Sequence, residues 1–186
     1  MEKEIKRCFW ANPKNNLYIE YHDKEWGIPT HDDHRLLEML ILESFQAGLS
    51  WECVLNKREN FRIAFDNFEL DKICDYDENK MEELRQNEGI IRNKLKIKAA
   101  IKNSKIFKEI QKEFGSFSDY IWHFTNNKVI YEIGKTSSEL SDTISKDLKK
   151  RGMNFVGTTI IYSYLQAVGV IYSHEKDCFL YKNCNK

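Results

Sequence analysis

The sequence predicts an all-α protein whose helices pack as an irregular bundle. Three observations support this class. Apolar residues recur at helical spacing along much of the chain, the 186 residues include only two prolines, and strand-forming sequence is confined to the short stretch KVIYE at 128–132. A chain of this length buries a hydrophobic core without disulfide bonds, as one large domain or two small ones.

The clearest helix is predicted over residues 33–47. One stripe of this helix contains Leu36, Leu40, Glu43 and Ala47. Gly48 ends the helix, and Ser50 is typical of an N-cap for the next one. Further helices are predicted, from apolar spacing and from the Ser, Asp and Gly residues between them, over 51–63, 78–87, 93–113, 117–123, 139–150 and 157–170.

The charge balance and the cysteine count limit the class of protein. Lys plus Arg and Asp plus Glu each number 29, so a net charge of zero neither suggests nor excludes a polyanionic partner. Five cysteines, an odd number, argue against a disulfide framework and leave thiols or metal ligands. The first residues contain no apolar segment of signal-peptide length, and the uncharged run 156–173 contains hydroxyl and amide side chains that suit a core helix better than a membrane span. We therefore expect a cytoplasmic protein without membrane contact.

Glu43 falls on the otherwise apolar stripe of the helix predicted over 33–47. Burying a carboxylate there is costly unless it is protonated, paired or in contact with a ligand. The simpler alternative is an imperfect stripe from which Glu43 reaches water. Aromatic residues close in sequence favour a binding site, and these are Tyr18, Tyr21, Trp26 and Trp51. Aromatic faces around a carboxylate suit a flat, electron-poor ligand.

Residues 87–101, NEGIIRNKLKIKAAI, predict a helix-hairpin-helix motif. One helix ends at the start of this stretch, a tight turn contains Gly89, Ile90, Ile91 and Arg92, and a basic helix follows. Backbone N–H groups of such a turn bind a DNA phosphate, whereas the aliphatic side chains dock the hairpin.

Two basic segments extend this prediction. No acidic residue occurs between 89 and 105, and KDLKKRG at 146–152 is a second basic stretch. Either segment alone is as readily a solvated helix face. The basic helix directly after the hairpin favours nucleic acid as the partner.

A possible metal site involves both ends of the chain. SHEKDC supplies His174 and Cys178, whereas RCFW and YHDKEWG supply Cys8 and His22. Four nitrogen or sulfur ligands make a closed zinc site with no position for water, so we expect a structural zinc that joins the N- and C-terminal segments. Either half alone is a short spacing that chance often produces. The spare candidates are His31, His34 and Cys184.

The chain closely resembles the 3-methyladenine DNA glycosylase I family, of the helix-hairpin-helix superfamily. The segments that carry the resemblance are RCFW, YIEYHDKEWGIP, ESFQAGLSWECVLNKRENF, EGIIRNKLKIKAAI, KRGMNFVGTTIIYSYLQAVGV and HEKDC. It implies a single all-α domain over 1–186, with its termini joined by one structural zinc. It also implies a monomer of the bacterial cytosol that removes 3-methyladenine from alkylated double-stranded DNA, without lyase activity.

The resemblance also implies roles for individual residues. The family's structural zinc ligands match Cys8, His22, His174 and Cys178. Its base pocket matches Glu43, Tyr18, Tyr21, Trp26 and Trp51. Gly48 and Leu49 fall in a loop similar to the one that enters the DNA where the base has left. The family commonly has an Asp-Pro pair before the first pocket tyrosine, where this chain has NPKNNLY.

The chemistry of the lesion is consistent with these roles. Methylation at the ring nitrogen places a positive charge on adenine, so the base leaves as a neutral molecule and its glycosidic bond is weak before any enzyme acts. Glu43, as a carboxylate, is expected to accept hydrogen bonds from the purine N–H edge, a contact that favours the charged base. The alternative function is a non-enzymatic, zinc-stapled DNA-binding module, which needs the hairpin and the metal but not Glu43.

Overall fold

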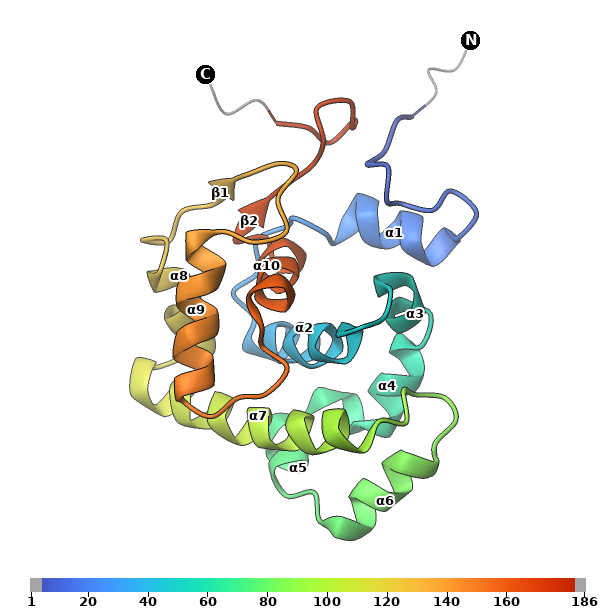
Figure 1. The fold of residues 1–186 in the computed structure, drawn as a ribbon, viewed down its shortest axis with the longest axis vertical. Coiled ribbons are helices and arrows are strands. Elements are labelled where there is room, and N and C mark those ends of the chain that lie inside the picture. The colour runs from blue at the N-terminus through green and yellow to red at the C-terminus, as the bar shows by residue number, and fades with distance from the viewer. Residues whose placement is uncertain (1–4, 183–186) are drawn as a thin grey trace.

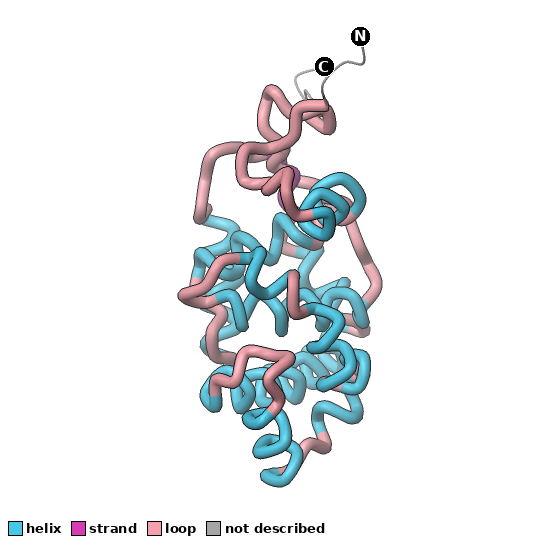
Figure 2. The backbone as a smooth tube through the Cα atoms, turned by 90° about the vertical axis from the view of Figure 1, so that its right-hand side faces the viewer, coloured by secondary structure: helices cyan, strands magenta, loops and turns pink. Residues whose placement is uncertain are grey.

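A computed structural model describes residues 5–182, and within them ten α-helices form an irregular bundle with one pair of short strands. Figure 1 shows α2 (Asp33–Gln46) near the centre, α7 (Lys94–Phe114) crossing beneath it, and both chain termini at the opposite end. In the view turned by 90°, loops make up much of the end that carries the termini (Figure 2). The prediction of an all-α fold is confirmed.

The other elements lie around these two helices. In chain order they are α1 (Asn16–Lys24), α3 (Trp51–Leu55), α4 (Arg58–Ala64), the 3-10 helix η1 (Asp66–Phe68), α5 (Leu70–Cys74), α6 (Glu78–Gln86), α8 (Phe117–His123), β1 (Ile130–Tyr131), α9 (Glu139–Lys150), α10 (Thr158–Ala167) and β2 (Ile171–Tyr172). Buried apolar side chains from Cys8 to Cys178 form one hydrophobic cluster. Among the described residues, no helix has the length and apolar character that a bilayer crossing requires.

Helix α2 is buried along almost its whole length. Asp32 caps its start by accepting a hydrogen bond from the His34 N–H at 3.1 Å, and every residue from Leu36 to Phe45 is buried. The elements packed around it include α3, α7, α8 and α10. A helix with no solvent-facing side must find partners for its polar side chains inside the protein.

Glu38 on α2 has such partners. Its carboxylate accepts hydrogen bonds from Arg58 Nε at 2.8 Å, Arg62 Nε at 2.9 Å and Arg35 Nη1 at 3.1 Å. The Arg35 and Arg58 guanidinium groups also bind Glu25, just after α1. Because guanidinium groups surround this buried charge, Glu38 is a structural group that joins α2 to α4.

Helices α6 and α7 form the helical hairpin predicted over 87–101. Asn93 caps α7 by accepting hydrogen bonds from two backbone N–H groups, at 3.0 and 3.1 Å. Ile90 is 3% exposed and packs into the core. Gly89 lies so close to α4 that a Cβ atom there would come within 3.1 Å of Asn60. The glycine and the isoleucine therefore dock the hairpin against the bundle.

Several boundaries differ from the predicted ones. The helix predicted over 51–63 is two helices, α3 and α4, because Lys57 leaves the helical conformation (φ −103°, ψ 1°). The short elements α1, η1 and α5 have too few apolar repeats for the spacing to predict them. The helix predicted over 157–170 ends at Ala167, and the following apolar residues form β2, which pairs in parallel with β1 inside KVIYE. The other predicted helices agree to within one residue at each end.

The end of α10 is a point of close backbone contact. Gly169 has a φ of +74°, and a Cβ atom there would lie 2.2 Å from Pro29 N and 2.3 Å from the Ile28 carbonyl carbon. Backbone N–H groups of segment 27–30 also donate to carbonyls at the end of α10, at 3.0 and 3.1 Å. The segment that follows Trp26 is thereby fixed against α10.

We expect Gly169→Ala to lower the free energy of unfolding by about 3 kcal/mol or more, because the methyl group has to displace backbone atoms. Gly134→Ala is the matched control, since Gly134 has a φ of +72° but nothing within 4 Å of its added Cβ. Gly134→Ala should lower the free energy of unfolding by only about 1–2 kcal/mol, the cost of placing alanine in the left-handed conformation. Urea denaturation measures both variants, and equal losses would contradict the backbone contact.

Candidate active site and metal cluster

A cavity of about 390 Å³ opens between α1, α2, α3 and α10. All five side chains that the sequence assigned to a base pocket line it, namely Glu43, Tyr18, Tyr21, Trp26 and Trp51. The cavity therefore brings together residues from three helices and from the segment after α1.

Aromatic rings form much of the cavity wall. The rings of Tyr21 and Trp51 lie 5.2 Å apart at 46°, and those of Trp10 and Trp26 lie 4.8 Å apart at 69°. Trp10 was not among the predicted pocket residues, although it lies in the RCFW motif, because it occurs in a non-helical segment where spacing carries no information. These tilted and edge-to-face contacts are the favourable arrangements of aromatic pairs.

Glu43 differs from Glu38 on the same helix. It is 2% exposed, and its Oε2 has no hydrogen-bond partner among the described residues. Burial raises the pKa of the Glu43 carboxyl to about 8, so near neutral pH the group holds its proton. The predicted alternative in which Glu43 reaches water is therefore wrong. An unpaired buried carboxyl group at a cavity wall is suited to a ligand that supplies hydrogen-bond donors.

Two other cavity side chains have unpaired buried polar atoms. Gln46 Oε1 and Trp51 Nε1 make no hydrogen bond within residues 5–182. Gln46 lies one turn after Glu43 on α2, so both acceptors approach the cavity from the same helix. Together with the Glu43 carboxyl group, the cavity offers an amide oxygen and an indole N–H, which is a pattern for the polar edge of a heterocycle.

Four buried side chains converge directly behind Trp26. The ligand atoms of Cys8, His22, His174 and Cys178 all lie within 4.8 Å of one another. Cys178 Sγ is 3.5 Å from His22 Nε2 and 3.5 Å from His174 Nδ1, and Cys8 Sγ is 3.6 Å from His174 Nδ1. Bonds of about 2.0–2.3 Å to a tetrahedral metal give ligand separations of about 3.6 Å. The cluster thus has the donors and the spacing of a closed metal site.

Neighbouring groups orient both histidines of the cluster. His22 Nδ1 lies 2.7 Å from Asp23 Oδ1, and His174 Nε2 lies 3.3 Å from the Trp26 carbonyl oxygen. Each contact directs the other ring nitrogen to the cluster. Burial lowers the pKa of His22, and that of His174 to about 4, so both rings are neutral near pH 7, the form that binds metal.

The spare ligand candidates lie elsewhere. His31 Nδ1 contacts Ser118 Oγ at 2.9 Å, and His34 Nε2 donates to the Asn67 carbonyl at 2.6 Å. Cys184 lies outside the described residues. His31 and His34 therefore take no part in the cluster.

The hairpin turn uses part of its backbone internally. The Gly89 N–H donates to Asn87 Oδ1 at 2.8 Å, and the Ile90 N–H donates to the Asn87 carbonyl at 3.4 Å. The N–H groups of Ile91 and Arg92 make no hydrogen bond within the described chain. Of the four turn residues predicted to bind a phosphate, Ile91 and Arg92 therefore have backbone N–H groups available for it.

Lys96 connects the hairpin to the end of α2. This side chain is 7% exposed, and its Nζ donates to the carbonyls of Phe45 at 2.8 Å and Ala47 at 2.5 Å. The next two residues are Gly48, with a φ of +77°, and Leu49, which is 42% exposed. The ammonium group satisfies carbonyls at the helix C-terminus and so fixes the start of this exposed loop relative to α7.

The protein is an all-helical bundle with a helical hairpin, and its aromatic cavity contains an unpaired carboxyl group. This is the architecture of a helix-hairpin-helix DNA glycosylase. Residues 10–181 match the family model described as methyladenine glycosylase. The chain belongs to the 3-methyladenine DNA glycosylase I family, whose members are hydrolases acting on N-glycosyl bonds.

Similarity to relatives extends over nearly the whole chain. DNA-3-methyladenine glycosylase 1 of Escherichia coli (strain K12) is 44% identical over 184 residues, which are 95% of this chain and 97% of that protein. A crystal structure of 3-methyladenine DNA glycosylase I has a TM-score of 0.91 at 43% identity, covering 95% of this chain and 100% of that one. The Staphylococcus aureus enzyme, in a structure on 3-methyladenine recognition, has a TM-score of 0.88 at 32% identity, covering 92% and 95%.

The raised pKa of Glu43 predicts that stability falls with pH. The folded protein retains a proton that the unfolded chain releases, so stability is full below about pH 4.5 and is lost as the pH rises to about 8. The loss is on the order of 3 to 5 kcal/mol. Glu43→Gln lacks this loss, so we expect the variant to gain stability relative to the wild type between about pH 5 and about pH 9. Urea unfolding at both pH values measures the difference, and a pH-independent difference would refute the assignment.

Proposed function

We propose that this chain hydrolyses the N-glycosidic bond of 3-methyladenine in alkylated double-stranded DNA, with the flipped base bound in the aromatic cavity. The single observation that supports this most is Glu43, a buried carboxyl group with an unpaired oxygen in a cavity lined by aromatic rings. The family membership and the helical hairpin support the same function.

The lesion's charge explains how the cavity selects it. Each aromatic face favours a cation over a neutral base by about 0.5 to 2 kcal/mol. A cation next to Glu43 lowers the pKa of that carboxyl, so its proton leaves and the carboxylate accepts hydrogen bonds from the purine N–H edge. Neutral adenine does not shift this proton equilibrium, so Glu43 stays protonated. A protonated carboxyl is a weaker hydrogen-bond acceptor than the carboxylate that faces the methylated base.

Charge also governs the end of the reaction. When the glycosidic bond breaks, the base becomes neutral and the positive charge moves to the sugar, where water attacks. Glu43 then faces a neutral base and regains its proton from solvent, which weakens product binding. We propose no side-chain nucleophile and no lyase step, since Lys135, the lysine that lines the cavity, has its Nζ 3.0 Å from the Glu132 carboxylate in an ion pair.

The DNA and metal parts of the proposal have separate support. The hairpin turn would bind phosphate through Ile91 and Arg92, and Gly48 with Leu49 would enter the space that the base leaves. The four-residue cluster would hold one zinc as a closed structural site, because its thiol and imidazole donors and its spacing of about 3.6 Å suit that ion. We propose a single domain, since one hydrophobic cluster extends from Cys8 to Cys178, and we propose a monomer from the resemblance to the family.

Base release tests the proposed function directly. We expect the wild type to release free 3-methyladenine from methylated duplex DNA and Glu43→Gln to do so about 10- to 100-fold more slowly, which is the worth of a hydrogen bond to a charged group. Glu109→Gln, on the exposed side of α7, is the control and is expected to match the wild type. No release by the wild type would favour the non-enzymatic DNA-binding module, and equal release by Glu43→Gln would remove Glu43 from its role.

Metal analysis tests the cluster. We expect about one zinc per chain in the wild type and a clear loss in Cys178→Ser, with Cys53→Ser, a half-buried thiol outside the cluster, as the control. Loss of a zinc present at a thousandfold its Kd costs about 4 kcal/mol of stability, so the midpoint of thermal unfolding should fall in Cys178→Ser. Base excision should fall only as the folded fraction does, and an unchanged metal content would contradict the ligand set.

A further inference from the structure

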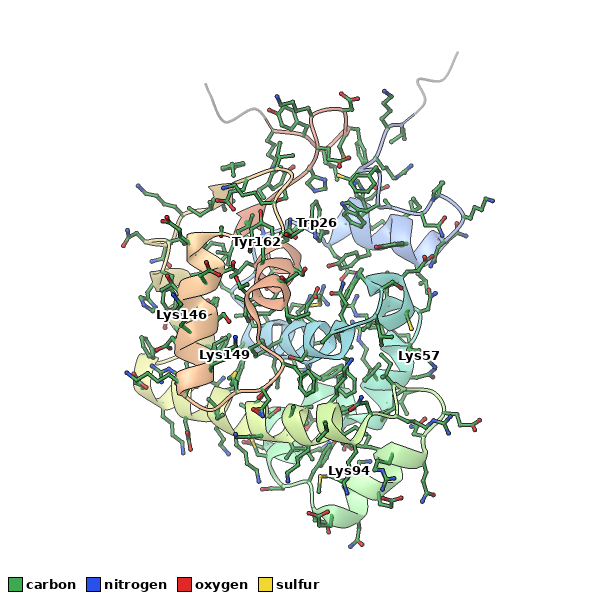
Figure 3. The ribbon with its side chains drawn as sticks, viewed as in Figure 1. Trp26, Lys57, Lys94, Lys146, Lys149 and Tyr162 are labelled. Atoms are coloured by element: carbon green, nitrogen blue, oxygen red, sulfur yellow. The ribbon has the colours of Figure 1, made fainter. Side chains whose placement is uncertain are left out.

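A second surface groove lies between α7 and the loop that joins α9 to α10. It has a volume of about 600 Å³, and its lining combines apolar side chains with three lysines, Lys98, Lys102 and Lys149. All three lysines are exposed, and none makes an ion pair within residues 5–182. Figure 3 shows Lys149 on α9 beside the loop that follows this helix.

The two sides of α7 differ in charge. Lys98 and Lys102 also border the hollows between α6 and α7, which are lined by the carboxylates of Asp77, Glu78 and Glu82. No carboxylate lines the groove on the α9 side. On the α9 side, Lys98, Lys102 and Lys149 therefore border a groove whose lining contains positive charge and no negative charge.

The loop that forms one wall of the groove is held rigidly. Asn154 and Asn103 form two hydrogen bonds between the loop and α7, both at 2.9 Å, and Ser145 Oγ donates to the Val156 carbonyl at 2.7 Å. Between these contacts Phe155 has a φ of +55°, an unusual conformation for a bulky residue. A wall held in this way presents its groove in a fixed shape, which limits the entropy cost of binding.

The groove is continuous with both elements that are proposed to contact DNA. Leu95, which lines it, is in the first turn of α7 directly after the hairpin. Phe155, which also lines it, has its ring 6.0 Å from the Nζ of Lys96, the ammonium group that holds the carbonyls before Gly48. The groove therefore begins where the hairpin and the exposed loop meet.

We propose that this groove binds the phosphate backbone of the DNA that flanks the lesion, through Lys98, Lys102 and Lys149. The inference rests on the proposed glycosylase function and adds a contact surface to it. Lys98 and Lys102 are one helical turn apart, about 6 Å along α7, and phosphates of one strand recur every 3.4 Å along the duplex axis. The two lysines thus span roughly two phosphates, and Lys149 approaches from the opposite wall.

Salt-dependent binding tests the groove. The groove variant combines Lys98→Gln, Lys102→Gln and Lys149→Gln, and the control variant combines Lys14→Gln, Lys112→Gln and Lys128→Gln, which remove the same charge from exposed positions elsewhere. The probe is a duplex of about two helical turns with a tetrahydrofuran abasic-site analogue at its centre. The Kd is measured over a series of salt concentrations, and binding of free 3-methyladenine and the midpoint of thermal unfolding are measured alongside.

We expect the groove variant to reduce the slope of log Kd against log salt concentration by about 2.7, because each phosphate contact contributes about 0.9. Its Kd at low salt should rise at least about tenfold, while free 3-methyladenine binding stays at the wild-type value. The single variant Lys149→Gln should reduce the slope by about 0.9 and tests the α9 wall on its own.

Equal slopes for the groove and control variants would overturn the groove proposal. A slope reduced only in the control variant would overturn it too. Base release by the wild type from methylated DNA is measured separately. Failure of base release would contradict the proposed function, whereas an unchanged salt slope would contradict the groove proposal alone.

Discussion

The burial of α2 from Leu36 to Phe45 is the constraint on which the other features depend. A helix enclosed by α3, α7, α8 and α10 has no water to solvate its polar side chains, so each must be satisfied by protein or by a ligand. Ser44 donates back to the Leu40 carbonyl at 2.8 Å, and Glu38 is surrounded by arginines. Glu43 is the acid of this helix that the described protein leaves unpaired, and the cavity lies at its oxygen.

Two structural devices fix the cavity wall opposite α2. On one side, His174 contacts the Trp26 carbonyl, so the cluster of two cysteines and two histidines touches a residue that lines the cavity. On the other side, the backbone after Trp26 packs against Gly169 at the end of α10. Stability and ligand binding are therefore coupled through Trp26. The buried Glu43 lowers the stability of the free protein, and a ligand that pairs with it relieves this cost.

The helices with repeated apolar spacing, the hairpin and the four converging ligands were predictable from the sequence. The distinction between Glu38 and Glu43 was not, because both are acids on one helix and two of the three arginines that pair with Glu38 come from α4. Trp10 was missed because an aromatic residue in a non-helical segment has no periodic neighbours. Strand β2 was missed because two apolar residues at the end of an apolar run extend the pattern of the preceding helix.

The cluster of two cysteines and two histidines also has a consequence for the order of events during synthesis. Cys8 and His174 are 166 residues apart in sequence. During translation, His174 is therefore added on the order of ten to thirty seconds after Cys8. α2 and the hairpin are complete well before that. Helix α10, which completes the enclosure of α2, is made only shortly before His174, so the burial of Glu43 and the wall at Trp26 are both completed at the end of synthesis.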